Sequence, residues 1–343
     1  MFTKITTGGV IGLWLRSCFQ RKSGQSVAVR SERAFVPHQD LYLFCVMGFI
    51  DVAGRCVWLK LNWLFACIVG FVAFHISSER RRQRECNLSR TLRLSEAETQ
   101  RVVRGSFFDF WYDTFSLSPR ITRAMSKEGD ITGLENLKQA LQKGKGVILW
   151  ESVFFGRRVL AKAILKENGF SLSQVHAEYH IGGLEHSKSR LGTRLIQPFF
   201  EKCERPFVEE IIYLHSNSLA STRVLLERLK QNAIVSITAD GKRGERFIAV
   251  EFLGAEDLFS TGMISLARLA GATILPVFCI QTARQRTNLI IEPPIRIDVS
   301  GDREHDLKSA FIQYVKLLES YLERYPEQYR NWHSLRAPLR PIP

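Results

Sequence analysis

Short apolar strands that alternate with helical segments are the feature that most constrains how this chain can fold. The predicted strands are residues 146–150, 233–238, 272–280 and 288–291. The predicted helices are residues 159–168, 263–269 and 306–325. This alternation indicates an α/β fold with a mainly parallel sheet flanked by helices. Ligands in such folds bind at the carboxyl ends of strands, so chemistry is expected in the loops after Trp150 and Thr238.

The N-terminal part, residues 1–78, differs from the rest in composition. Residues 1–38 mix glycine, serine and basic residues and are predicted to form a basic tail, and residues 39–78 are predicted to form a membrane anchor. The run from Trp63 to Phe74 is twelve residues without a charge, short of the roughly 20 that span a bilayer. Two interpretations remain open: a single span in which Lys60 snorkels to the interface, or a monotopic helix lying in the interface.

The segment after the anchor is strongly basic. Residues 79–84 read ERRRQR, a cluster suited to anionic lipid headgroups or to a solvated helix end. Residues 79–335 are predicted to form one α/β domain, followed by a tail at residues 336–343. Ser95 followed by Glu98 has the pattern of a capping box, which predicts a helix running toward Phe115.

The overall charge favours a polyanionic partner. The chain has 48 Lys and Arg against 34 Asp and Glu, a net charge of +14. No zinc-finger spacing, RNP-like strand or basic zipper occurs in the sequence, so a membrane surface is favoured over nucleic acid. The seven cysteines are odd in number and form no C-x-x-C pair, which predicts free thiols in a reducing compartment.

An ordered series of short motifs follows the predicted strand 233–238. The series is Asp240-Gly-Lys-Arg-Gly244, Glu251-Phe-Leu-Gly254, Ser260-Thr-Gly262, Leu266-Ala-Arg268 and Gly271-Ala272 leading to Pro276-Val277. Asn87-Leu88 and the closing segment 326–333 extend it. In this order the motifs resemble the bacterial lipid A lauroyl/myristoyl acyltransferase family over roughly residues 40–335. Each motif alone is weak, and their order carries the resemblance.

The resemblance implies a catalytic histidine followed, after any four residues, by a carboxylate in the loop after the first α/β strand. Here Glu151 occupies the histidine position and Gly156 the carboxylate position. Three accounts fit this departure. Glu151 is itself the general base, with a pKa raised by partial burial beside Trp150 and Phe154; or another histidine reaches the site; or catalysis is lost and an acyl-lipid or acyl-carrier binding role remains.

The remaining candidate residues are basic or polar. The histidines considered for the second account are His176 and His180. The predicted substrate-binding residues are Arg157, Arg158, His180, Arg205, Asp240 and Arg243. Arg157 and Arg158 suit a phosphate or an anionic thioester donor, and the alternative is that they are solvated positions at a helix start. No metal site is expected, because the histidines lack zinc-type spacing.

The resemblance therefore predicts an acyltransferase that moves a fatty acyl group from an acyl-carrier protein or coenzyme A thioester to a hydroxyl of a lipid or glycolipid. Glu151 is the predicted catalytic residue, and no cofactor beyond the donor substrate is expected. The implied location is the cytoplasmic face of the bacterial inner membrane. The alternative from another class is a non-catalytic acyl-lipid or acyl-carrier binding protein on the same scaffold.

Overall fold

A computed structural model gives the architecture of most of the chain. It describes residues 38–55, 59–152, 156–177, 180–181, 184–185, 189–214, 219–240, 246–283, 286–298 and 301–333. The predicted C-terminal tail, and the predicted N-terminal tail apart from His38, lie outside these residues. The domain boundaries drawn from the sequence stay predictions.

The centre of the molecule is a seven-stranded sheet with the order β1-β11-β10-β2-β7-β3-β6. Its strands are β1 (Asp130–Thr132), β2 (Val147–Glu151), β3 (Leu172–Ala177), β6 (Glu210–Leu214), β7 (Ile234–Thr238), β10 (Thr273–Ala283) and β11 (Arg286–Ile291). All neighbours pair in parallel except β10 and β11. Two hairpins stand apart from the sheet: β4 (His180–Ile181) with β5 (Leu184–Glu185), and β8 (Phe247–Phe252) with β9 (Ala255–Ser260). The predicted mainly parallel sheet is confirmed.

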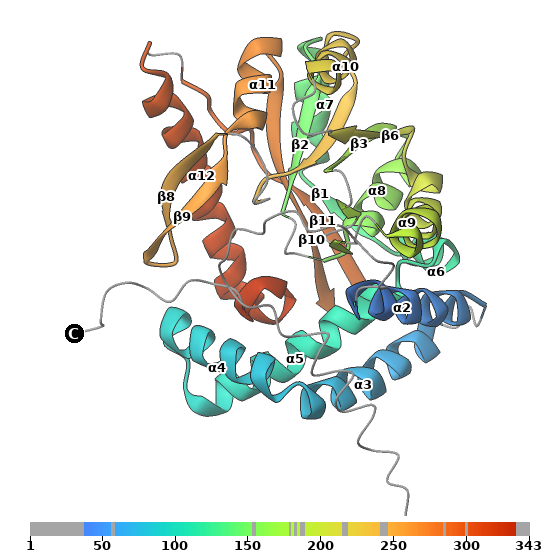
Figure 1. Ribbon diagram of the computed structural model, residues 1–343. Helices are drawn as coiled ribbons and strands as arrows, with labels where there is room; N and C mark the ends of the chain where they lie inside the picture. Colours follow the sequence, from blue (N-terminus) through green and yellow to red (C-terminus); the bar gives the residue numbers. More distant parts are fainter. Residues whose placement is uncertain are drawn as a thin grey trace, which may run out of the picture.

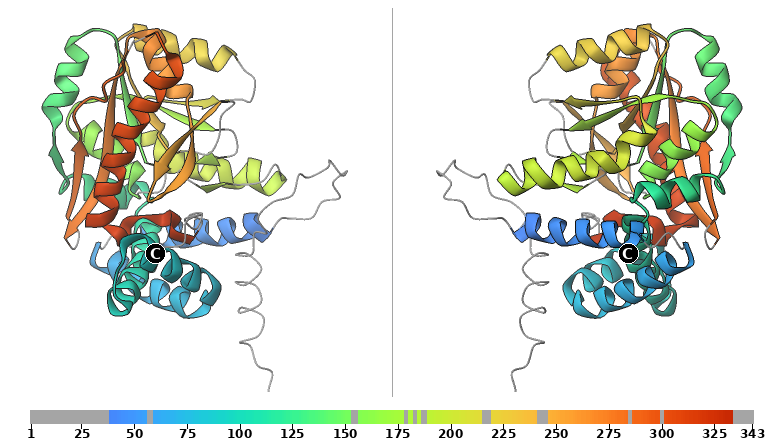
Figure 2. Two further views of the ribbon diagram at one scale, coloured as in Figure 1. Left: turned by 90° about the vertical axis from the view of Figure 1, so that its left-hand side faces the viewer. Right: turned by 90° about the vertical axis from the view of Figure 1, so that its right-hand side faces the viewer.

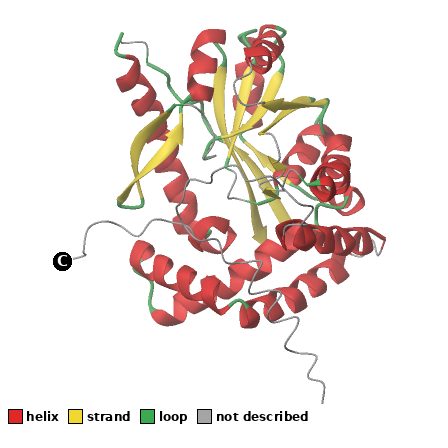
Figure 3. Ribbon diagram, viewed as in Figure 1, coloured by secondary structure: helices red, strands yellow, loops and turns green. Residues whose placement is uncertain are grey.

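Helices cover the sheet on both faces and at one end (Figure 1). The α-helices are α2 (His38–Arg55), α3 (Leu59–Ile76), α4 (Ser78–Leu92), α5 (Glu96–Phe115), α6 (Pro119–Ser126), α7 (Leu134–Gln142), α8 (Arg158–Glu167), α9 (Gln197–Glu204), α10 (Leu219–Lys230), α11 (Gly262–Ala270) and α12 (Arg303–Arg324). The shorter turns are η1 (Gly192–Ile196), η2 (Arg205–Phe207), η3 (Pro326–Gln328) and η4 (Arg330–His333). Helices α2 to α5 gather at one end of the molecule (Figures 2 and 3).

Strand β2 shows how the core is divided. All five of its residues are buried, and successive side chains point to opposite faces of the sheet. Trp150 packs on Phe311 and Tyr314 of α12, at ring-centroid distances of 5.2 and 4.6 Å. Val147 and Leu149 belong to a separate apolar cluster that includes residues of α8. A strand buried on both faces reads as a continuous apolar run, which is why the sequence predicted β2 correctly.

The predicted anchor folds as two helices that are packed against the domain. Helix α3 lies along α5, and the two backbones are close enough that a Cβ built on Gly70 would lie 2.9 Å from the Cα of Phe108. Within the described ranges, no single helix has the length and apolar character needed to cross a bilayer. Leu61–Ile76 and Ser78–Leu92 meet those criteria of length and composition only as a pair, bent by 90° where they join.

Two features near the start of the domain were also predicted. The capping box of Ser95 and Glu98 is confirmed, because each side chain accepts a hydrogen bond from the other residue's backbone N–H. The basic cluster is only partly as expected: Arg82 is exposed, but Arg84 is buried. The guanidinium of Arg84 donates to Ser106 Oγ at 2.6 Å. Arg84 therefore does not face lipid headgroups or solvent.

Candidate active site

The carboxyl ends of β2 and β7 lie side by side, as the sequence predicted for the loops after Trp150 and Thr238. Glu151 pairs in register with Thr238, and the N–H of Ala239 donates to the carbonyl oxygen of Glu151 at 2.8 Å. Ser152 follows Glu151 and Asp240 follows Ala239, and Ser152 Oγ donates to Asp240 Oδ2 at 2.5 Å. This parallel register brings Glu151 and Asp240, which are 89 positions apart in the sequence, to one edge of the sheet.

Glu151 is a buried carboxylate held by two cations from α8. Its Oε2 accepts from Arg158 Nε at 2.8 Å and lies 3.4 Å from Lys162 Nζ. Burial by itself would raise the pKa of Glu151, but the charges of Lys162 and Arg158 together hold that pKa below its ordinary value. The expectation of a raised pKa is therefore wrong. Phe154, the other residue of that expectation, lies outside the described residues.

A small pocket opens beside Glu151. It is lined by Glu151, Ser152, Gly156, Arg158, Ala161, Val277 and Cys279. Its two charged lining residues each have one buried atom without a hydrogen-bond partner in the described structure. These atoms are Glu151 Oε1 and Arg158 Nη2. A buried acceptor and a buried donor that are both unsatisfied favour the binding of a polar group between the strand end and α8.

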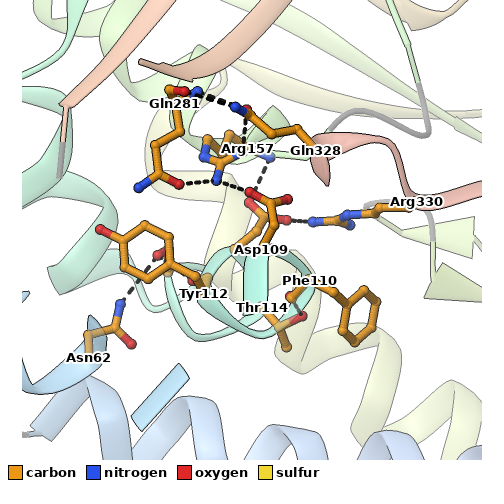
Figure 4. Close-up of polar contacts among 11 residues, drawn as sticks. Asn62, Asp109, Phe110, Tyr112, Thr114, Arg157, Gln281, Gln328 and Arg330 are labelled. Carbon is orange, nitrogen blue, oxygen red and sulfur yellow. Dashed lines mark hydrogen bonds and ion pairs between the residues drawn. The ribbon is translucent and has the colours of Figure 1, made fainter. Parts of the chain in front are cut away.

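Arg157 has a different environment from Arg158, although the two are neighbours in the sequence. Its Nη2 pairs with Asp109 of α5 and donates to Gln281 Oε1 at 2.6 Å, and its Nη1 donates to Gln328 Oε1 at 3.1 Å (Figure 4). Its backbone N–H donates to Asp113 Oδ1 at 2.6 Å. Arg157 therefore joins α5, β10 and η3, and its guanidinium is not presented to the pocket.

Both arginines are buried, at 1% and 8% exposure for Arg157 and Arg158. The interpretation of them as solvated positions at a helix start is therefore wrong. Helix α8 does begin at Arg158, and Arg157 precedes it with a left-handed backbone, φ 62°. That conformation is uncommon for a residue other than glycine, and it persists where contacts with the surrounding structure hold the backbone in it.

Gly156 lies where the β2–α8 connection passes α5. A Cβ built on Gly156 would lie 2.8 Å from Arg330 Nη2 and 3.1 Å from Asp113 Oδ2. Arg330 and Asp113 form an ion pair with each other. A side chain at position 156, which the resemblance assigns to the family's carboxylate, would therefore have to move the end of the Arg330 side chain aside.

The two histidines considered as replacement bases lie on different strands. His176 of β3 is buried, and its Nε2 lies 2.6 Å from Glu204 Oε2. Glu204 also pairs with Lys162 at 3.2 Å, so His176 reaches Glu151 only through two intervening side chains. His180 lies on β4, where its backbone pairs with that of Glu185, and its side chain is outside the described structure.

The other predicted substrate-binding residues are dispersed. Asp240 is buried and accepts from Ser152, which lines the pocket. Burial raises the pKa of Tyr314 and of Tyr329, and the charge of Asp240 raises both further. Arg205 is exposed at the start of η2, on the α9 side of the sheet. Arg243 lies in a segment outside the described residues. Of the predicted set, the structure therefore brings Glu151, Arg158 and Asp240 together.

Sequence reasoning missed Lys162, Glu204 and Ser152. Lys162 follows Arg158 by four positions and interrupts an otherwise apolar helical segment, VLAKAIL. That spacing places the two cations on one face of a helix, and it was the available signal. Glu204 gave no such signal, because its partner His176 is 28 residues away and on another element. Within the described parts of the chain, no group of His, Cys, Asp and Glu is arranged to hold a metal ion.

Comparison with known proteins agrees with the resemblance at a coarse level. Residues 204–335 match the model of the bacterial lipid A biosynthesis acyltransferase family. The chain is similar to a phosphatidylinositol mannoside acyltransferase of Mycobacterium tuberculosis, with 23% identity over 51% of this chain and 52% of that protein. A protein of the same name from Mycolicibacterium smegmatis is 21% identical over 52% of this chain and 55% of its own length. The chain spans about half the length of these relatives.

These matches confirm the predicted likeness to acyltransferases of lipid and glycolipid biosynthesis. The family match begins at residue 204, beyond Glu151 and Gly156. The substitution of glutamate for the family's histidine therefore rests on the sequence alone.

Proposed function

We propose that this protein is an acyltransferase that moves a fatty acyl group from an acyl-carrier protein or coenzyme A thioester to a hydroxyl of a lipid or glycolipid. The observation that carries the proposal is the pocket at the end of β2, where Glu151 Oε1 and Arg158 Nη2 both lack a partner. The matches to acyltransferases support the reaction class. A glycolipid acceptor is consistent with the relatives, whose names specify a phosphatidylinositol mannoside.

In the proposed reaction Glu151 is the general base. Oε2 is occupied by Arg158 and Lys162, so Oε1 is the oxygen that accepts the proton of the acceptor hydroxyl. As that proton leaves, the hydroxyl oxygen forms a bond to the thioester carbonyl carbon. The bond from carbon to sulfur then breaks, and the thiolate takes the proton from Glu151. A lowered pKa keeps Glu151 ionised, the state a base requires, at neutral pH.

Arg158 supplies the positive charge in this scheme. Its Nη2 is placed to donate to a substrate oxygen, either of the thioester donor or of a phosphate that the donor carries. Asp240 and Ser152 form the polar wall next to it and are proposed to hold the acceptor. Arg205, Arg243 and His180 stay as proposed outer contacts of the donor or acceptor.

The proposed location is the cytoplasmic face of the bacterial inner membrane. Exposed apolar side chains on α2 and on α3 support membrane contact; they are Leu41, Phe44, Phe49, Val52, Leu61, Leu64, Phe65, Ile68, Phe71 and Val72, each at least 36% exposed. So many exposed apolar side chains on two helices are unusual for a soluble monomer. Helix α5 packs on α3 and also holds Arg157, which precedes the pocket residue Arg158. This arrangement favours a monotopic anchor.

The experiment uses the purified full chain with acyl-coenzyme A and acyl-carrier protein thioesters and a panel of lipid and glycolipid acceptors. Thiol release and the mass of the acylated lipid are measured together. Wild type should yield both, and Glu151→Gln should abolish both. Glu167→Gln, an exposed glutamate of α8, is the matched control and should keep wild-type activity.

Three outcomes distinguish the hypotheses. Full activity in Glu151→Gln would overturn the role of Glu151 as base. Thioester binding without acyl transfer by wild type would favour the non-catalytic binding protein. No binding and no transfer with either donor would reject both functions.

A further inference from the structure

A chain of buried ion pairs leads away from the pocket, and its far end has no part in the proposed reaction. Arg158, Glu151, Lys162 and Glu204 alternate in sign, and His176 follows Glu204 at the end of the chain. The joining distances are 2.8 Å from Arg158 to Glu151, 3.4 Å from Glu151 to Lys162, 3.2 Å from Lys162 to Glu204 and 2.6 Å from Glu204 to His176. The chain crosses from β2 through α8 to α9 and β3.

Lys162 is the centre of this chain and is fully buried. Its ammonium group donates to Glu151 Oε2 and, at 3.0 Å, to the carbonyl oxygen of Arg158, and it forms an ion pair with Glu204 Oε1. Lys162 does not line the pocket. It therefore acts through its neighbours.

Removing Lys162 would leave two buried carboxylates close together. Glu151 would keep Arg158 and Glu204 would keep His176, but the cation between them would be gone. Two carboxylates that share a buried site cannot both stay ionised without cost, so at least one pKa rises. Of these two carboxylates, Glu151 is the one that lines the pocket.

We infer that Lys162 is a positioning residue for catalysis: by bridging Glu151 and Glu204 it fixes Glu151 Oε2, leaves Oε1 for the acceptor hydroxyl and keeps the carboxylate ionised. This inference rests on the proposed function. Glu204 lies behind Lys162 and contacts both Lys162 and His176. The positive charges that keep Glu151 ionised come from α8.

The pH dependence must consider every titratable or charged group that faces Glu151 or Glu204. From α8 these are Arg158 and Lys162, from β3 His176, from β6 Tyr213, from β10 Cys279 and from the end of β7 Asp240. Burial raises the pKa of Cys279 to about 12 and also raises that of Tyr213, so both stay neutral near pH 7. The groups that can set the ionisation of Glu151 in that range are therefore the cations of α8 and the Glu204–His176 pair.

The test compares Lys162→Met, which keeps the length and removes the charge, with Lys162→Arg, which keeps the charge. The ionisation of Glu151 is followed by infrared difference spectroscopy of the carboxylate band, assigned with Glu151→Gln. In Lys162→Met the titration of Glu151 should move up by about one pH unit or more, as expected when an opposite charge within about 4 Å is lost. Lys162→Arg should restore most of the wild-type titration.

A second readout is the pH profile of acyl transfer. In Lys162→Met the acid limb of kcat should move up with the infrared titration, while KM for the thioester changes less than twofold. A loss of kcat that is equal at all pH values would show a merely structural role and overturn the inference. An unchanged Glu151 titration in Lys162→Met would also overturn it.

The double variant Lys162→Met with Glu204→Gln keeps the experiment decisive if the single variant does not fold. It removes one buried cation and one buried anion together, so it should fold better than Lys162→Met while still showing a raised titration of Glu151. A wild-type titration in the folded double variant contradicts the inference. The infrared readout needs no turnover, so failure of the proposed acyl transfer would be visible separately.

Discussion

Arg157 and Arg158 are adjacent in the sequence and have opposite relations to the pocket. The Arg157 guanidinium contacts three elements of the protein itself, whereas Arg158 pairs with Glu151, lines the pocket and has a buried Nη2 without a hydrogen-bond partner. The left-handed backbone at Arg157 separates the two side chains. The difference teaches that residue type identified two phosphate-binding candidates, whereas only the surroundings show that Arg157 is tied to the protein itself and that Arg158 lines the pocket.

The largest expected effect is the loss of stability when Arg157 is replaced. Arg157→Ala should lower the free energy of unfolding by about 3–5 kcal/mol, because it leaves the buried carboxylate of Asp109 without its partner. Urea denaturation followed by circular dichroism measures this loss. Arg157→Lys keeps the charge but not the planar fork of donors and should lose less. A loss under about 1 kcal/mol in Arg157→Ala would contradict the structural assignment, given the magnitude usual for broken buried pairs.

Replacing Arg158 should act mainly on activity. Arg158→Met should lower kcat on the order of 10²-fold, the usual cost of losing one donor to a developing charge. Its stability should fall less than that of Arg157→Ala, because Lys162 still pairs with Glu151. Steady-state kinetics and urea denaturation of the same preparations test both statements. Arg223→Met, at an exposed position of α10, is the control for loss of a cation; equal kcat in the two variants would remove Arg158 from the site.

Lowering the pH should reduce the stability that the ionised carboxylate of Glu151 contributes beside Arg158. The pKa values of Glu151 and Glu204 are both lowered in the folded protein from an ordinary value of 4.5. A carboxylate with a lowered folded pKa contributes stability above its unfolded pKa and loses it as the pH falls toward the folded value. The stability advantage of wild type over Glu151→Gln should therefore be constant near pH 7 and shrink below pH 4.5. Urea titrations of both proteins across this range measure the difference, and an advantage that grows in acid would refute the ion-paired state of Glu151.

The smallest effect concerns the helix that holds Arg157. Ser95 caps α5, which carries Asp109 and Asp113. Ser95→Ala should reduce the free energy of unfolding by about 1 kcal/mol through loss of the cap. Acyl transfer should keep its wild-type rate below the melting temperature. A large loss of kcat in a fully folded Ser95→Ala would show that α5 takes part in catalysis and does not only support Arg157.

Much of the scaffold could be predicted because its signals are local. The buried strands read as apolar runs, and the capping box of α5 is visible within four residues. The convergence of the loops after β2 and β7 follows from the parallel sheet alone, and it placed Glu151 and Asp240 together correctly.

The charge state of the site could not be predicted in the same way. The pKa of Glu151 depends on burial and on Lys162 and Arg158, which α8 brings back over the strand end. Lys162 in turn pairs with Glu204, from a helix that begins 46 residues further along the chain than Glu151. The role of Arg157 depends on Gln281 and Gln328, at separations of 124 and 171 residues. Residue type suggests that such groups are charged, and only the fold determines which charges they meet.

Gly156 has a consequence for how this site could change over time. A side chain at this position would meet the guanidinium of Arg330, the end of a long side chain that can move aside. An aspartate or glutamate there would also place a second negative charge beside Asp113, which already pairs with Arg330. A carboxylate at position 156 would therefore compete with Asp113 for Arg330, and the rearrangement of that ion pair is what such a substitution costs.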